Sequence, residues 1–365
     1  MKSAAPNTEI ASTPRPHPAS SAPLTVSSVG NDERARWDAF VTSESVGSLY
    51  HLYDWTRINE SVLRHESHYL AAQEHGEIVG VLPLVLIRSR LFGRILCSMP
   101  FVNFGGPIAK SPRIANALLE HAVTLAGESK SDYLELRCAS PIEGDLPVSK
   151  RKVSMTLALN ADPEALYASF TRKHRKNIRS AQRGGFEVRS GGTDILPDFY
   201  RVLEESWRGL GTPLYGMSYF RQVVETFPSR TTVFVCYQHG EPVAVALTGH
   251  SNRTVEGLWA GTRPRLRHLN ANYVLYWEMI RHACIAGHER FHLGRSTADS
   301  GSEQFKGKWN AEAQQLYWYY WRPNQRTLPE LNVDNPKFRL AIAAWRRLPL
   351  WATRILGPPI ARSIP

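Results

Sequence analysis

The order of elements along this chain occurs twice. Two apolar segments, Tyr69–Ile87 and Thr231–His250, each contain two apolar strands around a short glycine-bearing turn, EHGE or QHGEP. Glycine adopts the positive φ that such turns need, so each segment predicts a β-hairpin. In both halves helices precede the hairpin, and a strand, a helix and a last strand follow it. This duplication predicts an α/β (α+β) fold of two tandem domains with mixed, largely antiparallel sheets.

The length of 365 residues is enough for two domains with separate cores. We expect a disordered tail at residues 1–23, domains at 24–160 and 161–325, and a basic amphipathic tail at 326–365. The first tail is rich in Pro, Ser and Ala and lacks the apolar region of a secretory signal. No apolar run approaches the ~18 residues of a membrane-spanning helix. Together with four scattered cysteines, this favours a cytoplasmic protein.

The segment FTRKHRKNIRSAQRGGF, Phe170 to Phe186, is strongly basic. It has six Lys or Arg among the twelve residues from Arg172 to Arg183 and no acid. On a helix, residues three and four apart share a face. That face carries Arg172, Arg175, Lys176, Arg179 and Arg183. It suits the phosphates of a nucleotide-linked substrate or CoA, or an RNA backbone. A solvated face partly neutralised by nearby acids is the alternative.

Six segments carry a family resemblance that extends from about residue 24 to the C-terminus. They are YHLYDWTRI, HYLAAQEHGEIVGVLPLVLIRSRLFGR, SMPFVNFGGP, FTRKHRKNIRSAQRGGFEV, GRSTADSGSEQFKGKWN and QLYWYYW. In this order they resemble the FemAB-related proteins, in particular the subgroup associated with exosortase/PEP-CTERM exopolysaccharide loci. The resemblance implies tandem GNAT-like domains and transfer of an acyl or aminoacyl group to an amine. It implies no tightly bound cofactor, and acyl-CoA or aminoacyl-tRNA as co-substrate.

The stretch LGRSTADSGSEQFKGKWN is a polar loop after a predicted strand, where a rigid scaffold commonly presents chemistry. Phe305 and Lys306 match the Phe-Lys pair of the family. The resemblance implies that Lys306 stabilises the oxyanion that develops at the donor carbonyl. Family members often read Phe-Lys-Lys, whereas Gly307 here separates Lys306 from Lys308. Lys308 is therefore a second candidate, and simple solvation of both lysines is the alternative.

Acylation of an amine also requires a proton acceptor. Glu256 is an acid within the apolar segment TVEGLWAG, which makes it a candidate general base or, alternatively, a strand residue that faces solvent. None of the thirteen histidines has metal-ligand spacing with another, so we expect no metal site. Five further residues are candidates for substrate or phosphate binding: Arg295, Ser296, Asn103, Tyr215 and Asn272.

These five residues are candidates for binding for different physical reasons. Arg295 and Ser296 can hold a phosphate or carbonyl oxygen, while Asn103 lies in a glycine-rich loop that is either a pocket wall or a tight turn. Tyr215 can line a sugar or acyl cleft, a role for which Trp259 is less suited than for core packing. Asn272 and its neighbour Asn270 start a long helix, where one can cap and the N-terminus can hold a pyrophosphate.

The C-terminal segment from residue 336 to 356 predicts a basic amphipathic helix. Its apolar residues recur at helical spacing, and Asp334 is the last acid of the chain. Such a helix either packs on the protein's own core or lies on an anionic membrane surface.

Together these features predict a cytoplasmic N-acyltransferase, or one peripheral at the inner face of the membrane. We expect it to act on a phosphate-bearing or lipid-linked glycan precursor of the cell envelope or an exopolysaccharide. Two noncatalytic alternatives are an RNA-binding protein and a scaffold for exopolysaccharide assembly. The basic segment has no aromatic residue between Phe170 and Phe186, which counts against RNA binding.

Overall fold

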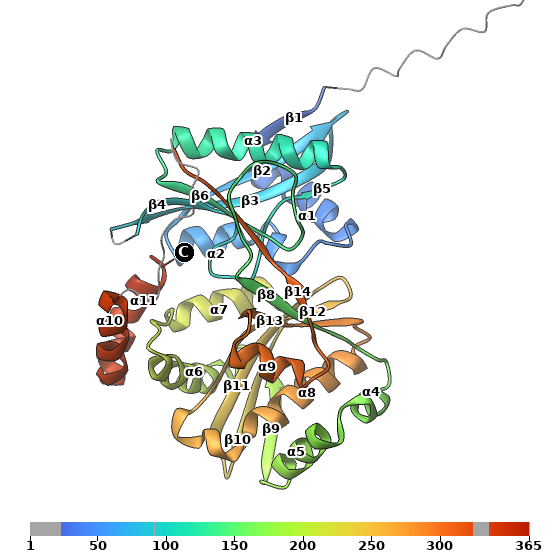
Figure 1. The fold of residues 1–365 in the computed structure, drawn as a ribbon, viewed down its shortest axis with the longest axis vertical. Helices are drawn as coiled ribbons and strands as arrows, with labels where there is room; N and C mark the ends of the chain where they lie inside the picture. The colour runs from blue at the N-terminus through green and yellow to red at the C-terminus, as the bar shows by residue number, and fades with distance from the viewer. Residues whose placement is uncertain (1–22, 91, 324–335, 365) are drawn as a thin grey trace, which may run out of the picture.

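The computed structural model describes residues 23–90, 92–323 and 336–364 (Figure 1). The predicted disordered tail, residues 1–23, lies outside these residues except for Pro23. Two mixed sheets, one in each half of the molecule, carry helices on their faces. This arrangement confirms the predicted α/β fold with two largely antiparallel sheets.

The first sheet follows the order β1-β2-β3-β4-β6-β15-β7, and β5 pairs with β3. Its neighbours are antiparallel except for β4 and β6, which run parallel. The strands are β1 (Thr25–Ser28), β2 (Glu66–Glu74), β3 (Glu77–Ser89), β4 (Gly93–Cys97), β5 (Ile108–Ala109), β6 (Tyr133–Cys138), β7 (Val148–Ser149) and β15 (Tyr317–Trp321).

The second sheet, read from its other edge, follows the order β9-β10-β11-β12-β13-β8-β14. Only β12 and β13 are parallel, so the two sheets have the same sequence of pairings. The two predicted hairpins, β2–β3 and β10–β11, occupy the second and third places of their sheets. The strands are β8 (Lys152–Ala158), β9 (Phe186–Gly191), β10 (Thr231–Gln238), β11 (Glu241–Ser251), β12 (Thr254–Thr262), β13 (Arg290–Thr297) and β14 (Glu312–Gln315).

The two halves exchange one strand in the sixth place of each sheet. Strand β8, which sequence reasoning grouped with the first half, lies in the second sheet, and β15 lies in the first. The crossing segments are tied together, because the Gln315 side-chain amide donates to the carbonyls of Lys150 and Lys152, both at 2.9 Å. The sheets therefore do not divide at residue 160, while the domain boundaries themselves remain a prediction.

Equivalent helices join the parallel strands of each half: α3 before β6, and α8 before β13. Helix α3 begins with Pro112 in its first turn, and the Ser111 side chain accepts from the Ile114 N–H as its N-cap. The helices are α1 (Arg34–Ser43), α2 (Trp55–Ser61), α3 (Pro112–Glu128), α4 (Pro163–Ser169), α5 (Arg172–Gln182), α6 (Leu196–Leu210), α7 (Met217–Thr226), α8 (Ala271–Ile285), α9 (Gly301–Gly307), α10 (Pro336–Arg347) and α11 (Leu350–Ala361).

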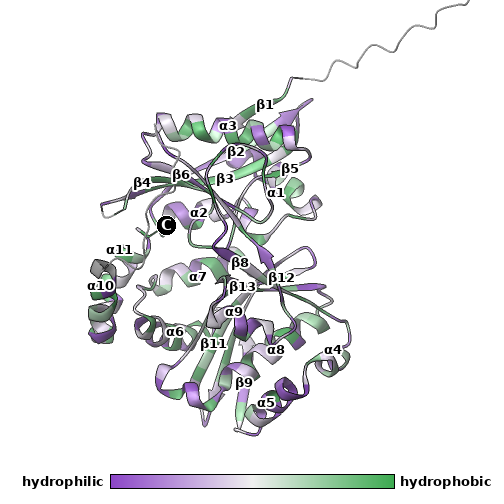
Figure 2. Cartoon of the chain, viewed as in Figure 1, coloured by the Kyte–Doolittle hydropathy of each residue, from purple (hydrophilic) through white to green (hydrophobic). Residues whose placement is uncertain are grey.

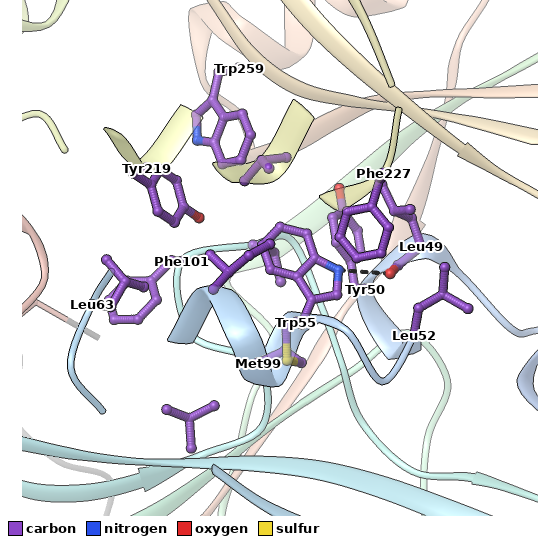
Figure 3. Close-up of a cluster of buried hydrophobic side chains, with 14 of the residues drawn as sticks. Leu49, Tyr50, Leu52, Trp55, Leu63, Met99, Phe101, Tyr219, Phe227 and Trp259 are labelled. Atoms are coloured by element: carbon purple, nitrogen blue, oxygen red, sulfur yellow. Dashed lines mark hydrogen bonds between the residues drawn. The ribbon is translucent and has the colours of Figure 1, made fainter. Parts of the chain in front are cut away.

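One continuous apolar core joins the two halves (Figure 3). Trp55 of the first half packs against Phe227 of the second, with ring centroids 5.6 Å apart. The Trp55 indole N–H donates to the Leu49 carbonyl at 2.8 Å, so its one polar group is satisfied. Such aromatic pairs add about 0.5–1.5 kcal/mol to the stabilisation from burial. This core fixes the position of one half against the other.

The C-terminal segment forms two helices, α10 and α11, rather than the single predicted helix. The chain turns at Pro349, the N-cap of α11, because proline disfavours a helical residue before it. Both helices pack on α6. There the Arg354 guanidinium pairs with both carboxylate oxygens of the buried Glu204. Among the described residues, no helix combines the length and apolar character needed to cross a bilayer.

Candidate active site

The second sheet opens between its two parallel strands. Strands β12 and β13 pair only from Thr254 to Glu256 and from Arg290 to His292. Directly afterwards both are irregular: Leu258 is an extra residue on β12, and the register of β13 shifts between His292 and Arg295. Bulges bend a strand and redirect its side chains. The opening therefore begins immediately after Glu256 and His292.

The corresponding place in the first sheet is filled by the chain itself. Strands β4 and β6 also pair over three residues, but their outer neighbours show no register shift. The loop after β4 then follows β6: Ser98 N–H donates to the Glu135 carbonyl at 2.9 Å, and Gly105 N–H to the Arg137 carbonyl at 3.0 Å. Gly106 lies so close to Cys138 that a Cβ there would be 2.7 Å from its Sγ. In the second sheet, the segment after β12 makes no such backbone hydrogen bonds to β13 among the described residues.

Glu256 lies at the start of the opening and is only 1% exposed, so it does not face solvent. Its carboxylate is 2.9 Å from His292 Nδ1 and 3.4 Å from the Tyr50 hydroxyl of the first half. Asn103 Nδ2 donates to that hydroxyl at 2.7 Å. Burial, and then the Glu256 charge, raise the pKa of Tyr50 well above its usual value. The Tyr50 hydroxyl therefore stays protonated and can donate a hydrogen bond to the Glu256 carboxylate.

Lys306 reaches the same opening from α9 and is 7% exposed. Its ammonium donates to the carbonyls of Gly294 at 2.8 Å and Arg295 at 2.9 Å. Gly294 has φ +81°, and a Cβ there would lie 3.2 Å from the Gly257 carbonyl oxygen. Burial, and then the charge of Arg295, lower the pKa of Lys306 to about 8. An ammonium has three N–H groups, and no described residue accepts from the third.

A cavity of about 290 Å³ lies between the two halves, beside this group. Three predicted binding residues, Asn103, Tyr215 and Arg295, line it together with Tyr50. Trp259 also lines it, while packing in the core as predicted with its ring 5.5 Å from Tyr219 and 5.3 Å from Phe220. Ser296 is buried next to Arg295 and shares a 3.2 Å hydrogen bond with Ser302.

The predicted basic helix is α5, and its polar surface is visible in Figure 2. Arg172, Lys176 and Arg179 are exposed on it. Arg175 differs from them, because its Nη1 donates to the Phe170 carbonyl at 2.6 Å and to that of Ala168. The structure therefore places Arg175 as a cap on the end of α4, whereas the other three are free of such a role.

Helix α5 packs beside the start of α8 and the end of α9. The His174 ring is 4.4 Å from that of Trp309, and Asn177 Nδ2 lies 3.4 Å from the Tyr273 hydroxyl in the first turn of α8. Burial, and then the charge of Lys308, lower the pKa of His174 to about 4. The exposed Lys308 thus lies near the basic surface of α5, unlike the buried Lys306.

Asn272 is partly buried in the first turn of α8. Asn270 occupies the N-cap position, but its side chain donates to the His268 carbonyl at 3.1 Å. The expected side-chain cap is therefore absent at this helix. Asn270 has φ +58°, a left-handed conformation that asparagine tolerates, and this sets the entry of the chain into α8.

The sequence-predicted residues thus form two groups. The inner group at the opening and cavity comprises the buried Tyr215, Glu256, Ser296 and Lys306 and the partly buried Asn103 and Arg295. The outer group comprises Arg172, Lys176, Arg179, Asn272 and Lys308. Sequence reasoning missed Tyr50 and His292, whose roles depend on the strand register and on contact between the halves. Among the described residues, no group of three or more His, Cys, Asp or Glu side chains could hold a metal ion.

In the second half, which contains this opened sheet, residues 168–307 match the family model described as an acetyltransferase (GNAT) domain. The sequence matches no curated protein.

Solved structures extend this likeness to both halves. FemX is 15% identical, with 81% of this chain and 97% of FemX covered and a TM-score of 0.60. The C-terminal domain of a putative lysylphosphatidylglycerol synthetase from Agrobacterium fabrum is 14% identical, with 79% and 91% covered and a TM-score of 0.53. A tandem GNAT protein from the clavulanic acid biosynthesis pathway is 12% identical, with 83% and 100% covered and a TM-score of 0.51. At these identities the likeness establishes a tandem GNAT-like fold.

Proposed function

We propose that this protein is an N-acyltransferase that moves an acyl or aminoacyl group from a phosphate-bearing donor to an acceptor amine. The observation that carries the proposal is the placement of Glu256 and Lys306 where the parallel strands β12 and β13 stop pairing, beside the cavity between the halves. The acceptor amine attacks the donor carbonyl, which forms a C–N bond and a tetrahedral oxyanion and requires the amine to lose a proton. Collapse of this intermediate breaks the donor's C–S or C–O bond and releases the CoA thiol or the tRNA hydroxyl, which takes up a proton. The free N–H of Lys306 stabilises the oxyanion, and Glu256 accepts the proton.

The donor approaches from the side of α5 and the start of α8. Exposed Arg172, Lys176 and Arg179, with Lys308 nearby, offer cations to phosphate groups. Asn272 adds an amide at the helix start, where backbone N–H groups favour anions. The donor is acyl-CoA or an aminoacyl-tRNA, and it is a co-substrate rather than a tightly bound cofactor.

The acceptor amine enters the cavity between the halves, where Tyr215 and Trp259 provide the aromatic area that suits a sugar ring. We place the reaction in the assembly of a cell-envelope or exopolysaccharide precursor. This follows the resemblance to FemAB-related proteins of the PEP-CTERM-associated subgroup, and it agrees with FemX as a structural neighbour. A lipid-linked acceptor would bring the protein to the inner face of the membrane.

Binding and turnover assays test this proposal. The purified full chain is titrated with acetyl-CoA and with aminoacyl-tRNA, and transfer to a panel of amino sugars is followed by mass spectrometry. We expect one donor to bind and to be consumed, with turnover lost in Lys306→Ala and kept in the exposed Lys150→Ala control. Absence of binding by both donors would show the proposal to be wrong. Equal binding of charged and uncharged tRNA without turnover would instead support the RNA-binding alternative.

A further inference from the structure

Arg295 is a cation without an acidic partner. It lines the cavity between the halves, and its Nη1 donates to the Val102 carbonyl at 3.3 Å. Its guanidinium also lies 5.3 Å from the centre of the Trp318 ring. A guanidinium carries five N–H groups, and no carboxylate among the described residues lies within ion-pair distance of it. Arg295 therefore has unused donors at the cavity wall.

A second arginine stands behind it. Arg137 is fully buried and lies 4.5 Å from the same Trp318 ring. Its Nε pairs with the buried Glu135 at 2.7 Å, but its Nη1 has no hydrogen-bond partner. Lys152 is close enough that burial, and then the charges of Arg295 and Arg137, lower its pKa. Three cations therefore share this region with the carboxylate of Glu135, while Glu256, which lies beyond Tyr50, is engaged with His292.

This excess of positive charge is costly unless something compensates it. Buried charges in proteins are normally paired, because desolvation penalises an ion that has no counter-ion. Arg295 shows the penalty, since burial and then the charge of Arg137 lower its pKa to about 10. An anion in the cavity would meet the free fork of Arg295 and relieve its repulsion from Arg137. A planar guanidinium binds carboxylate or phosphate through two parallel hydrogen bonds.

We propose that Arg295, backed by Arg137, is an anion-binding subsite that holds a carboxylate or phosphate of the acceptor inside the cavity. The acceptor is then an amine that also carries an acidic group, such as an amino sugar phosphate or an amino acid. The assignment to the acceptor rests on the proposed function, whereas anion binding at Arg295 does not. Asn103 links the subsite to the reacting group, because its Oδ1 accepts from the Arg295 backbone N–H at 3.4 Å while its amide donates to Tyr50.

Anion binding is tested without any donor. The full chain is titrated with inorganic phosphate and, separately, with acetate at constant ionic strength, and binding is followed by calorimetry. We expect saturable binding that weakens about 10-fold or more in Arg295→Met, since one charge-assisted bond accounts for a factor of that size. Arg295→Lys keeps the charge but lacks the fork, and should bind with intermediate strength. Arg281→Met, which removes an exposed arginine of α8, is the matched control and should leave binding unchanged.

The outcomes separate this inference from the proposed function. Equal affinity in wild type and Arg295→Met, or no saturable binding to the folded wild type, would overturn it; a melting curve verifies the fold of each variant. Tighter binding of phosphate than of acetate would indicate that the acceptor's acidic group is a phosphate, and the reverse would indicate a carboxylate. Once a donor is known, glucosamine 6-phosphate should have a lower KM than glucosamine in wild type; Arg295→Lys should reduce the difference and Arg295→Met should remove it. If the protein binds anions at Arg295 but transfers no acyl group, the anion-binding subsite is supported and the proposed acyltransferase function is contradicted.

Discussion

At the residue scale, burial distinguishes Lys306 from its neighbour Lys308 as the candidate for catalysis. The sequence FKGKW offers Lys306 and Lys308. The structure buries the first at the opening of the second sheet and leaves the second exposed near α5. Burial also changes the titration of Lys306, because desolvation disfavours its charged form. This lowered pKa supplies a test of the role of Lys306.

We predict that kcat falls as pH rises through about 8, the pKa of Lys306. Below this pH the ammonium is protonated and stabilises the oxyanion; above it the charge is lost. Removing such a donor typically lowers kcat by about 10²–10³-fold, so Lys306→Ala should lose this much with little change in KM. In Lys306→Arg the guanidinium stays protonated, and the fall should move to higher pH. A rate that rises through pH 8 would show instead that Lys306 acts as the base.

Glu256 should behave as the proton acceptor. Glu256→Gln keeps the shape of the side chain but cannot take up a proton, so we expect kcat to fall by about 10²–10⁴-fold. The control is Glu312→Gln, which neutralises an exposed acid on β14. Unchanged kcat in Glu256→Gln at saturating substrates would assign Glu256 a structural role beside Tyr50 and His292.

The site residues that could be predicted share a local anomaly in the sequence. Glu256 is an acid in an apolar strand, and Lys306 follows a polar loop after a strand. Tyr50 and His292 show no such anomaly. His292 becomes a partner of Glu256 only through the parallel register of β12 and β13, and Tyr50 only through packing of the two halves. Such non-local pairings cannot be predicted from one sequence.

At the scale of elements, the basic residues of α5 differ in their contacts, although they share one helical face. Helical spacing places Arg175 on the same face as Arg172, Lys176 and Arg179. The structure nevertheless directs Arg175 to the carbonyls that end α4. Capping of this kind is invisible in the spacing, because it depends on how the previous helix turns into α5.

The exposed face of α5 predicts how donor binding responds to substitution. Arg179→Ala should raise the KM of the donor about 10-fold, because one charge-assisted phosphate contact is lost. Lys110→Ala is the control: Lys110 is an exposed lysine of the first half, outside α5. Equal effects of the two substitutions would contradict a phosphate site and indicate only general attraction by net charge.

The dependence of binding on ionic strength distinguishes the two candidate donors, aminoacyl-tRNA and acyl-CoA, at α5. Binding of an aminoacyl-tRNA neutralises many phosphates and should weaken steeply with ionic strength, while a CoA site should show a shallow dependence. A slope that Arg172→Ala, Lys176→Ala and Arg179→Ala together leave unchanged would exclude α5 from donor binding.

For the whole molecule, the duplication could be predicted from the two hairpins, but the exchange of strands could not. Strands β8 and β15 occupy the same sixth place in the two sheets, so each sheet offers a position that either could fill. The crossing segments meet at Gln315, whose side chain bonds to the carbonyls of Lys150 and Lys152. The two sheets also differ at their parallel strands, because the loop after β4 makes backbone hydrogen bonds to β6 in the first sheet but only side-chain contacts to Arg295 in the second.

The C-terminal helices have two distinct faces. One packs on α6 through Trp345 and Arg354, as the docking alternative expected. The other exposes Leu340, Trp351, Ile355 and Leu356, each between 46% and 72% exposed. Exposed Arg339 and Arg347 accompany them, and α10 and α11 contain no acid. We propose that this outer face lies on an anionic membrane, which would bring the cavity, lined in part by Ala361 and Ile364, to a lipid-linked acceptor.

Vesicle flotation tests the membrane proposal with the full chain. We expect the protein to float with vesicles of phosphatidylglycerol and phosphatidylcholine and to bind pure phosphatidylcholine weakly, because each basic residue near an anionic surface contributes about 1 kcal/mol. The double variant Trp351→Ser, Ile355→Ser should weaken binding by more than about 10-fold, since burying each of these side chains contributes about 1.5–3 kcal/mol. Ile285→Ser removes a side chain that is 63% exposed on α8, outside the tail, and should leave flotation unchanged. Equal recovery of wild type and the double variant on anionic vesicles would exclude this face as the membrane contact, and the tail would then serve only to close the cavity wall.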